Sequence, residues 1–178
     1  LVEDLLLLVQ IDSGRARLEF GALASRRQNL GDIVQHTTGQ FAAAAKKRGL
    51  SLEVDVDGSL PPVELCEAYF VDALGRLVEN GIKFSRDESK QVKITASSGP
   101  EWVKIAVSDE GVGIPEEQQD RLFDRFRQFE REKLEQQGVG LGLSIADELI
   151  RLHGGKIAVD SAPGQGSTFT ILLPHATR

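Results

Sequence analysis

Two hydrophobic periodicities alternate along this chain of 178 residues, and this alternation limits the folds that it can adopt. A polar–apolar alternation is typical of a half-buried strand, whereas an apolar residue every three or four positions is typical of a helix. The strand pattern occurs at 15–20, 50–56, 91–97, 101–109, 154–161 and 166–174. The helix pattern occurs at 29–49, at 66–84 and in the stretch after Gly142. We therefore expect an α+β fold, a two-layer α/β sandwich with about three helices on one face of a mixed sheet of five or more strands.

The N-terminal segment, LVEDLLLLVQID at 1–12, is apolar on nearly every face of a helix. Its apolar residues form two stripes: Leu1, Leu5 and Leu8, and Val2, Leu6 and Val9. Such a helix needs partners on several sides. We therefore expect residues 1–14 to be part of a helical bundle, and residues 15–178 to form the globular domain.

Composition excludes several classes of protein. The chain is acidic, with a net charge of −6, whereas a nucleic-acid-binding domain typically has a basic surface. No apolar run approaches the ~18 residues of a membrane span. The single cysteine, Cys66, cannot form an internal disulfide and is better explained as a small buried residue than as a catalytic one. Methionine is absent even at position 1, which suggests a piece of a longer or processed protein.

A glycine-rich stretch, QQGVGLGLSIADELI at 136–150, runs into a predicted helix. It matches neither G-x-x-x-x-G-K-[ST] nor G-x-G-x-x-G, so the two common phosphate loops are excluded. HExxH and CxxC are also absent, which argues against a catalytic zinc. Free backbone amides at a helix N-terminus still favour an anion. A packing turn is the weaker alternative at this position.

The segment LVENGIKF at 77–84 places Glu79, Asn80 and Lys83 within one helical turn. The asparagine oxygen is a ligand that Mg²⁺ accepts, glutamate can take a proton, and lysine can meet a phosphate. Taken alone, a surface pair between Glu79 and Lys83, worth ~0.2–0.5 kcal/mol, explains the spacing better.

Two further glycine-containing turns follow predicted strands. In DEGVGIP at 109–115, Asp109 can accept a hydrogen bond from an exocyclic amine such as that of adenine, and the glycines allow close backbone approach. A plain turn is an equally good explanation of this segment alone. PGQGSTFTI at 163–171 reads as a tight turn beside the sheet, and a simple hairpin explains it well.

Together, and in this order, these segments resemble the boxes of bacterial sensor histidine kinases. LVENGIKF resembles the N box, DEGVG the G1 box, LFDRF at 122–126 the F box and QGVGLGL the G2 box. The resemblance covers about residues 15–174 and implies the Bergerat fold, which gyrase and MutL ATPases share. Residues 1–14 then resemble the end of the dimerisation and phosphotransfer helix.

The resemblance implies a role for each matching residue. Asn80 would ligate Mg²⁺, Glu79 would help to deprotonate the attacking imidazole, and Lys83 would neutralise phosphate charge. The implied ATP-binding residues are Asn80, Asp109, Gly111, Gly113, Ile114, Phe123, Phe126, Gly138, Gly140, Leu141, Gly142 and Thr168. A lid would run from about 115 to 137 and carry Arg127, Arg131 and Lys133. Gly81 replaces the usual alanine, which either loosens the helix or leaves room for the nucleotide.

The resemblance also implies ATP and Mg²⁺ as cofactors and a cytoplasmic domain, with a parent protein that is either free or membrane-anchored. No SHELRTP-like acceptor motif occurs, so we expect this chain to bind ATP but not to phosphorylate itself. The expected partners are a response regulator and the phosphotransfer helix of a homodimeric parent, with no nucleic acid. The open alternatives are a non-catalytic nucleotide-binding or docking module and a gyrase- or MutL-type ATPase.

Overall fold

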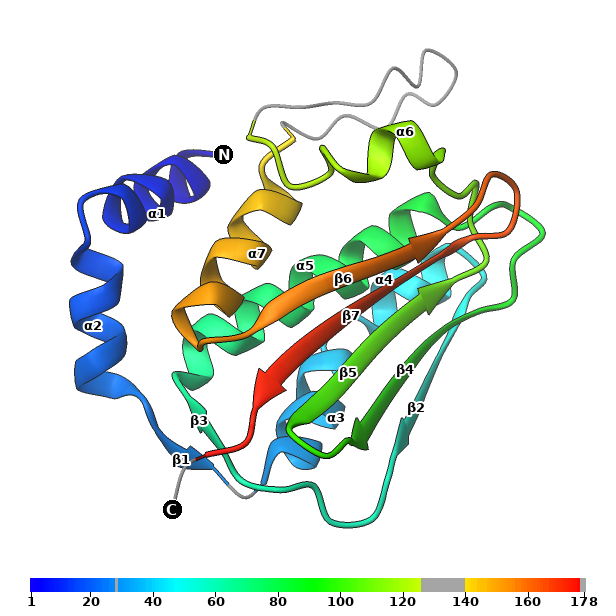
Figure 1. Ribbon diagram of the computed structural model, residues 1–178. Helices are drawn as coiled ribbons and strands as arrows, with labels where there is room; N and C mark the ends of the chain where they lie inside the picture. The colour runs from blue at the N-terminus through cyan, green and yellow to red at the C-terminus, as the bar shows by residue number, and fades with distance from the viewer. Residues whose placement is uncertain (28, 126–139, 177–178) are drawn as a thin grey trace.

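A computed structural model describes residues 1–27, 29–125 and 140–176 of the chain (Figure 1). Its helices are α1 (Val2–Asp12), α2 (Arg15–Leu23), α3 (Leu30–Gly39), α4 (Ala42–Lys47), α5 (Glu67–Phe84), α6 (Glu116–Gln119) and α7 (Gly142–Leu152). Its strands are β1 (Ser25–Arg27), β2 (Ser51–Val56), β3 (Val63–Leu65), β4 (Gln91–Ser98), β5 (Trp102–Asp109), β6 (Lys156–Ser161) and β7 (Ser167–Pro174).

The main sheet has five strands in the order β2-β4-β5-β7-β6. The β2–β4 pair is parallel and the other three pairs are antiparallel, so the sheet is mixed. Helices α3, α5 and α7 cover one face of it (Figure 1). The expected α+β sandwich with helices on one face is therefore confirmed.

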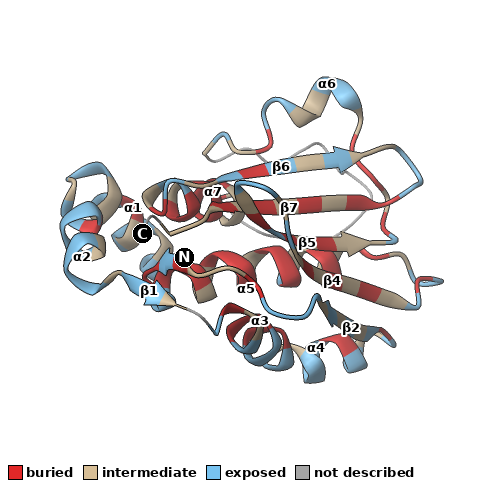
Figure 2. Ribbon diagram, turned by 60° about the horizontal axis from the view of Figure 1, so that its bottom comes forward, coloured by how far each residue is buried: buried red, intermediate tan, exposed pale blue. Residues whose placement is uncertain are grey.

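The core lies between that face and the helices. Figure 2 shows buried residues alternating along the strands and lining α5 and α7. The strand residues that face the helices are buried, and they include Ile94, Ile105 and Ile171, which are fully covered. Alternation places Lys93 and Lys104 on the opposite, more open face. Each strand therefore buries one face, as its period of two predicts.

The strand expected at 15–20 is wrong, because this segment is part of helix α2. Its side chains contact the domain at helical spacing. Ala16 is fully buried, the Phe20 ring meets the His153 ring edge-on at 4.8 Å, and Glu19 accepts a 3.0 Å hydrogen bond from the Tyr69 hydroxyl. Burial and this bond raise the pKa of Tyr69 to about 12. Tertiary contacts thus override a short alternating pattern.

The single helix expected at 29–49 is also corrected, because α3 ends at Gly39 and α4 begins at Ala42. Between them Phe41 packs on α5, where a Cβ added to Gly75 would lie 3.1 Å from Phe41 Cζ. The break turns this aromatic side chain toward α5. Sequence periodicity also missed the two-stranded sheet in which β1 pairs antiparallel with β3.

Helix α1 docks on the domain through one stripe of residues, four positions apart. Leu8 is buried, Asp4 accepts a 2.8 Å hydrogen bond from Arg76 of α5, and Asp12 accepts two 2.7 Å bonds from Arg125. The bonds from Arg125 hold the pKa of Asp12 below its usual value.

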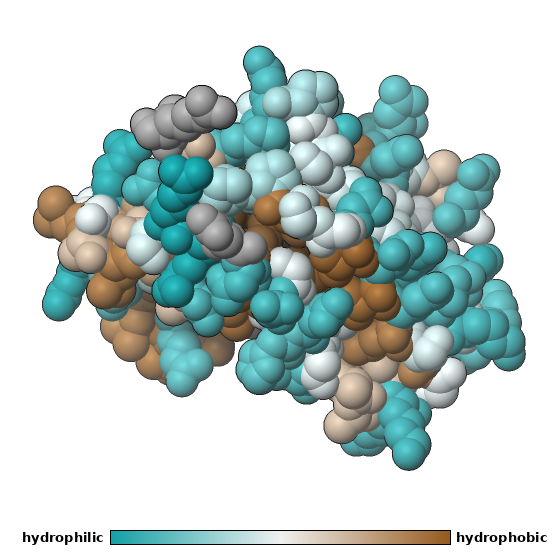
Figure 3. Space-filling model, turned by 90° about the horizontal axis from the view of Figure 1, so that it is seen from below, coloured by the Kyte–Doolittle hydropathy of each residue, from teal (hydrophilic) through white to brown (hydrophobic). Residues whose placement is uncertain are grey.

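Leu7 and Ile11 of α1 are half-buried and pack on the core beside Leu8. Other large apolar residues at the N-terminus and in α1 and α2 are exposed, and they are Leu1, Val2, Leu5, Leu6, Val9, Leu18 and Leu23. Figure 3 shows apolar surface on the left, the side on which Figure 1 places these two helices, and a second apolar area nearer the centre. One stripe of α1 therefore packs on the domain while the others face solvent, in keeping with a helix that is apolar all round.

Candidate functional site

The C-terminal turns of α5 carry the predicted Glu79, Asn80 and Lys83. The helix forms because its apolar residues recur at helical spacing and pack on the sheet, which leaves Glu79 exposed and Asn80 and Lys83 half-buried. Gly81 faces the sheet, since an added Cβ would lie 3.0 Å from Val92 Cγ1. The glycine at position 81 is therefore explained by the packing of α5 on the sheet and not by room for a nucleotide.

Asp109 is the last residue of β5, as the sequence predicts, and it orients the turn that follows. Its Oδ1 accepts a 2.8 Å hydrogen bond from the Gly111 amide. Gly111 in turn pairs with Ser85 in an antiparallel bridge, so the turn lies against the end of α5. A Cβ at Gly111 would overlap the Phe84 carbonyl oxygen. Gly111 is needed because two backbone segments meet here.

Gly113 is also held by a close backbone approach. It has φ +70, and a Cβ there would overlap the carbonyl of Ala162 in the β6–β7 turn. In the same turn Gly166, at φ +80, approaches the Asp109 carbonyl in the same way. Ile114 is buried at 5% exposure. The end of α5, the end of β5 and the β6–β7 turn thus form one tightly packed junction.

The structure does not bring Thr168 together with Asp109. Strand alternation puts Asp109 on the helix-covered face, whereas Thr168 pairs with Ser108 on the open face, with 2.9 Å between their hydroxyl oxygens. The cross-strand neighbour of Asp109 is Ser167, which is buried like Phe169 on the same face. Sequence reasoning missed Ser167, because the register between β5 and β7 decides the neighbour.

The predicted glycine-rich hinge is described from Gly140 onward. Gly140 has φ +76, a conformation that glycine adopts without strain, and Gly142 is the first residue of α7. Leu141 between them is buried, and its carbonyl accepts bonds from Ser144 Oγ at 2.9 Å and Ile145 N at 3.0 Å. Helix α7 therefore begins at Gly142, and the backbone amides of its first turn have no hydrogen-bond partners within the helix.

Part of the predicted lid, with Phe126, Arg127, Arg131 and Lys133, lies outside the described residues, as does Gly138 of the predicted hinge. The first turns of the lid are described. Phe123 packs on the core, and Gln119 of α6 donates hydrogen bonds to the carbonyls of Ile114 at 3.0 Å and Ser161 at 2.8 Å. These contacts hold the segment after Ile114 against the β6–β7 hairpin. Figure 1 shows α6 on the side where β5 ends and α7 begins.

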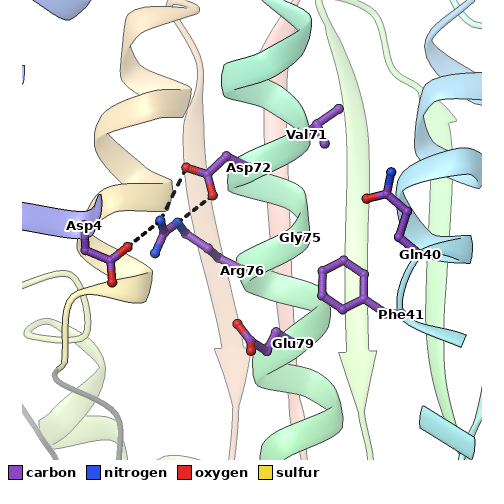
Figure 4. Close-up of a pocket in the computed structure, with 8 residues that line it drawn as sticks. All are labelled: Asp4, Gln40, Phe41, Val71, Asp72, Gly75, Arg76 and Glu79. Atoms are coloured by element: carbon purple, nitrogen blue, oxygen red, sulfur yellow. Dashed lines mark hydrogen bonds and ion pairs between the residues drawn. The ribbon is translucent and has the colours of Figure 1, made fainter. Parts of the chain in front are cut away.

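A cavity of about 380 Å³ lies on another face of α5, next to Glu79 (Figure 4). Its lining includes Asp4, Phe41 and Arg76, and Arg76 also donates a 3.0 Å hydrogen bond to Asp72. The lining includes neither Asn80 nor Asp109. Glu79 therefore lies between this cavity and the Asn80 side of the helix.

His153, at the C-terminal end of α7, is buried. Its Nδ1 lies 2.8 Å from the Leu149 carbonyl, and its Nε2 accepts a 3.2 Å bond from the Cys66 amide. Burial lowers the pKa of His153, which favours the neutral ring. The buried Cys66 and His153 thus have structural roles.

Comparisons with known proteins agree with this geometry. The profile of the histidine kinase-, DNA gyrase B- and HSP90-like ATPases matches residues 67–177, which include the end of α5, the turn after β5 and the start of α7. The chain belongs to this ATPase family. Within the family it is the ATP-binding domain of a histidine kinase, as its relatives indicate.

Two relatives are the alginate biosynthesis sensor protein KinB of Pseudomonas aeruginosa and the adaptive-response sensory kinase SasA of Prochlorococcus marinus. KinB is 36% identical over 98% of this chain, and SasA is 38% identical over 82% of it. The chain spans 28% of the length of KinB and 38% of that of SasA. It therefore corresponds to one part of these longer sensor proteins.

Solved structures show the same fold. Full-length ShkA in complex with AMPPNP superposes with a TM-score of 0.76 at 27% identity, over 98% of this chain and 37% of that one. The catalytic domain of the histidine kinase ThkA superposes with a TM-score of 0.74 at 26% identity, over 86% of this chain and 99% of that one.

None of the helices in the described ranges is long and apolar enough to cross a membrane.

Proposed function

We propose that this domain binds Mg²⁺-ATP and transfers its γ-phosphoryl group to a histidine located outside the chain. The observation that carries the proposal is the junction at the end of α5. There the bridge between Ser85 and Gly111 fixes the turn with Asn80 and Lys83 beside the end of β5 with Asp109. The similar ShkA was solved in complex with AMPPNP, which supports a nucleotide as the ligand of this domain.

The adenine end of the site is assigned to the turn after β5. The bond from the Gly111 amide orients the Asp109 carboxylate, which would accept a hydrogen bond from the adenine amine. Ser167 replaces Thr168 in this assignment, because Ser167 is the neighbour of Asp109 on the covered face. Ile114 and Gly113 continue the wall toward the β6–β7 turn.

The phosphate end is assigned to α5 and the start of α7. In the described part of the chain no cluster of three His, Cys, Asp or Glu residues could hold a metal on its own. The Asn80 amide oxygen is a suitable single ligand for Mg²⁺, which completes its shell with phosphates and water and neutralises their charge when bound. Lys83 would add a second positive charge, and Gly140 and Gly142 would leave the first amides of α7 accessible to phosphate.

We assign to Glu79 the role of proton acceptor in the transfer step. The unprotonated imidazole nitrogen of the acceptor forms a bond to the γ-phosphorus while the bond to the β–γ bridging oxygen breaks, and that electron pair leaves with ADP. The proton on the other ring nitrogen would pass to Glu79, which is exposed on α5 beside Asn80.

The proposed partners are a response regulator and the acceptor helix of a homodimeric parent protein. The exposed leucines of α1 and α2 would contribute to the contact between the two copies of the parent.

A transfer assay tests this function. Calorimetry with Mg²⁺-ATP should show binding, and γ-labelled ATP should label a separately supplied acceptor fragment of the parent but not this chain. Asn80→Asp should slow the transfer at constant protein stability. Binding without transfer would favour a non-catalytic module, and acid-labile label on this chain alone would contradict the assignment of an external acceptor.

A further inference from the structure

Arg48, which follows α4, donates hydrogen bonds to the last turn of α5 and to Ser85, the residue that caps this helix. Its Nη1 lies 3.2 Å from the Lys83 carbonyl oxygen, and its Nη2 lies 2.9 Å from that of Ser85. Within the described residues these two carbonyls are the hydrogen-bond partners of the half-buried guanidinium. The two ends of this contact are 35 and 37 positions apart in the sequence.

These bonds are directed at groups that need partners. The last four carbonyls of a helix lack partners within the helix, and the negative end of the helix dipole favours a cation there. The planar fork of arginine can reach two oxygens at once, which the ammonium of lysine does less well. Arg48 therefore completes the end of the helix that carries Asn80 and Lys83.

The backbone around Arg48 is itself fixed. Gly49 has φ +71 and donates to the Lys46 carbonyl at 2.9 Å, and the buried Leu50 donates to the Ala45 carbonyl at 2.9 Å. This arrangement is the Schellman type of helix end, in which the glycine adopts the left-handed conformation. The side chain of Arg48 is thus directed from the end of α4 toward the end of α5.

The connection between α5 and β4 is held from both sides. On the side of Arg48, the Ser51 amide donates to the Lys90 carbonyl at 3.0 Å. On the other side, Glu110 accepts bonds from the Lys90 amide at 3.0 Å and from Ser89 Oγ at 2.9 Å. The segment that follows Lys83 is therefore fixed between the Arg48 turn and the turn after Asp109.

We propose that Arg48 is a positioning residue for the phosphate end of the nucleotide site. It holds the last turn of α5 in the direction that presents Asn80 and Lys83 to the phosphates and metal, without touching the nucleotide itself. The inference rests on the function proposed above. It adds α4, which lies outside the segments that resemble the kinase boxes, to the elements that determine Mg²⁺-ATP affinity.

The experiment compares Arg48→Gln and Arg48→Lys with Lys47→Gln, an exposed control at the end of the same helix. Calorimetry would measure the Kd of Mg²⁺-ATP and of adenosine for each, below its melting temperature. Arg48→Gln should weaken Mg²⁺-ATP binding about tenfold, or ~1.4 kcal/mol, and adenosine binding less than about twofold. Arg48→Lys should show a smaller loss of Mg²⁺-ATP binding, and Lys47→Gln none.

Arg48→Lys keeps the test valid if Arg48→Gln does not fold. An equal loss of Mg²⁺-ATP and adenosine affinity would show that Arg48 only supports the domain, and would overturn the inference. Unchanged Mg²⁺-ATP affinity in the folded variants would overturn it as well. A wild-type chain that binds no Mg²⁺-ATP would instead refute the proposed function, so the two failures are distinguishable.

Discussion

At the scale of single residues, neighbouring side chains of this domain have different surroundings because strand alternation and burial separate them. Ser167 and Thr168 are adjacent in sequence and lie on opposite faces of the sheet. His153 is polar, yet it is buried at 6% exposure. Residue type alone does not decide the role of such a side chain.

The Ser167–Thr168 pair gives a test of the face that the nucleotide uses. Ser167→Ala should weaken Mg²⁺-ATP binding severalfold, because Ser167 neighbours Asp109 on the helix-covered face. Thr168→Val, on the open face, should leave the Kd unchanged, and both constants can be measured by calorimetry. A larger effect from Thr168→Val would restore the original assignment of Thr168.

The burial of His153 predicts that the free energy of unfolding depends on pH. Burial lowers its pKa in the folded state below the ordinary value of 6.5, so the unfolded chain takes up the proton first as the pH falls. The free energy of unfolding should therefore decrease below about pH 6.5, by at most ~1.4 kcal/mol per pH unit from this group. Above that pH both states are neutral at His153, and its contribution is constant.

Urea denaturation between pH 5 and 8 measures this dependence. His153→Gln should remove part of the decrease, whereas His36→Gln, on the exposed face of α3, should keep it. An identical pH profile for wild type and His153→Gln would show that other groups cause the acid sensitivity.

At the scale of secondary-structure elements, the two glycines at the start of α7 differ in what they require. Gly140 has φ +76, where a side chain costs ~1–2 kcal/mol. Gly142 is helical, and a Cβ added there meets nothing within 4 Å. One glycine is therefore required by its conformation, and the other weakens its own helix.

Alanine substitutions should consequently have opposite effects. Gly140→Ala should lower the free energy of unfolding by ~1 kcal/mol and weaken nucleotide binding while the domain still folds. Gly142→Ala should raise the free energy of unfolding by up to ~1 kcal/mol, because alanine favours the helix. Circular dichroism during chemical denaturation measures both, and two changes of the same sign would contradict the geometry.

At the scale of the whole molecule, helix α1 is attached to the α/β sandwich by a small number of side chains. Leu8 is buried, Leu7 and Ile11 pack on the core beside it, and Asp4 and Asp12 form ion pairs on either side. The Asp12 side chain is 57% exposed, and ion pairs that are open to solvent contribute little to stability. We therefore expect the burial of Leu8 to contribute most to the docking of α1.

Leu8→Ala should therefore lower the free energy of unfolding by ~2 kcal/mol or more and increase hydrogen exchange along α1. Leu6→Ala removes a side chain that is 58% exposed, and it should change the stability of this chain by less than ~0.5 kcal/mol. Hydrogen-exchange mass spectrometry of both variants makes the comparison. Equal exchange of α1 in the two would show that Leu8 does not hold the helix.

Much of the architecture follows from the sequence by itself. The strands of the main sheet and the core of α5 and α7 repeat at the period of their structure, because each buries one face. The positions of Asp109 at the end of a strand and of Asn80 and Lys83 on a helix were equally predictable, since their order along the chain places them in these elements.

Only the tertiary structure decided the rest. The segment 15–20 is a helix because Ala16 and Phe20 pack at helical spacing, although its alternation suggests a strand. Ser167 is the neighbour of Asp109 because of the register of β7 against β5, and Arg48 reaches the end of α5 because α4 ends beside it. Local patterns specify which residues are buried, whereas contacts between distant segments depend on how the elements pack, which no local period encodes.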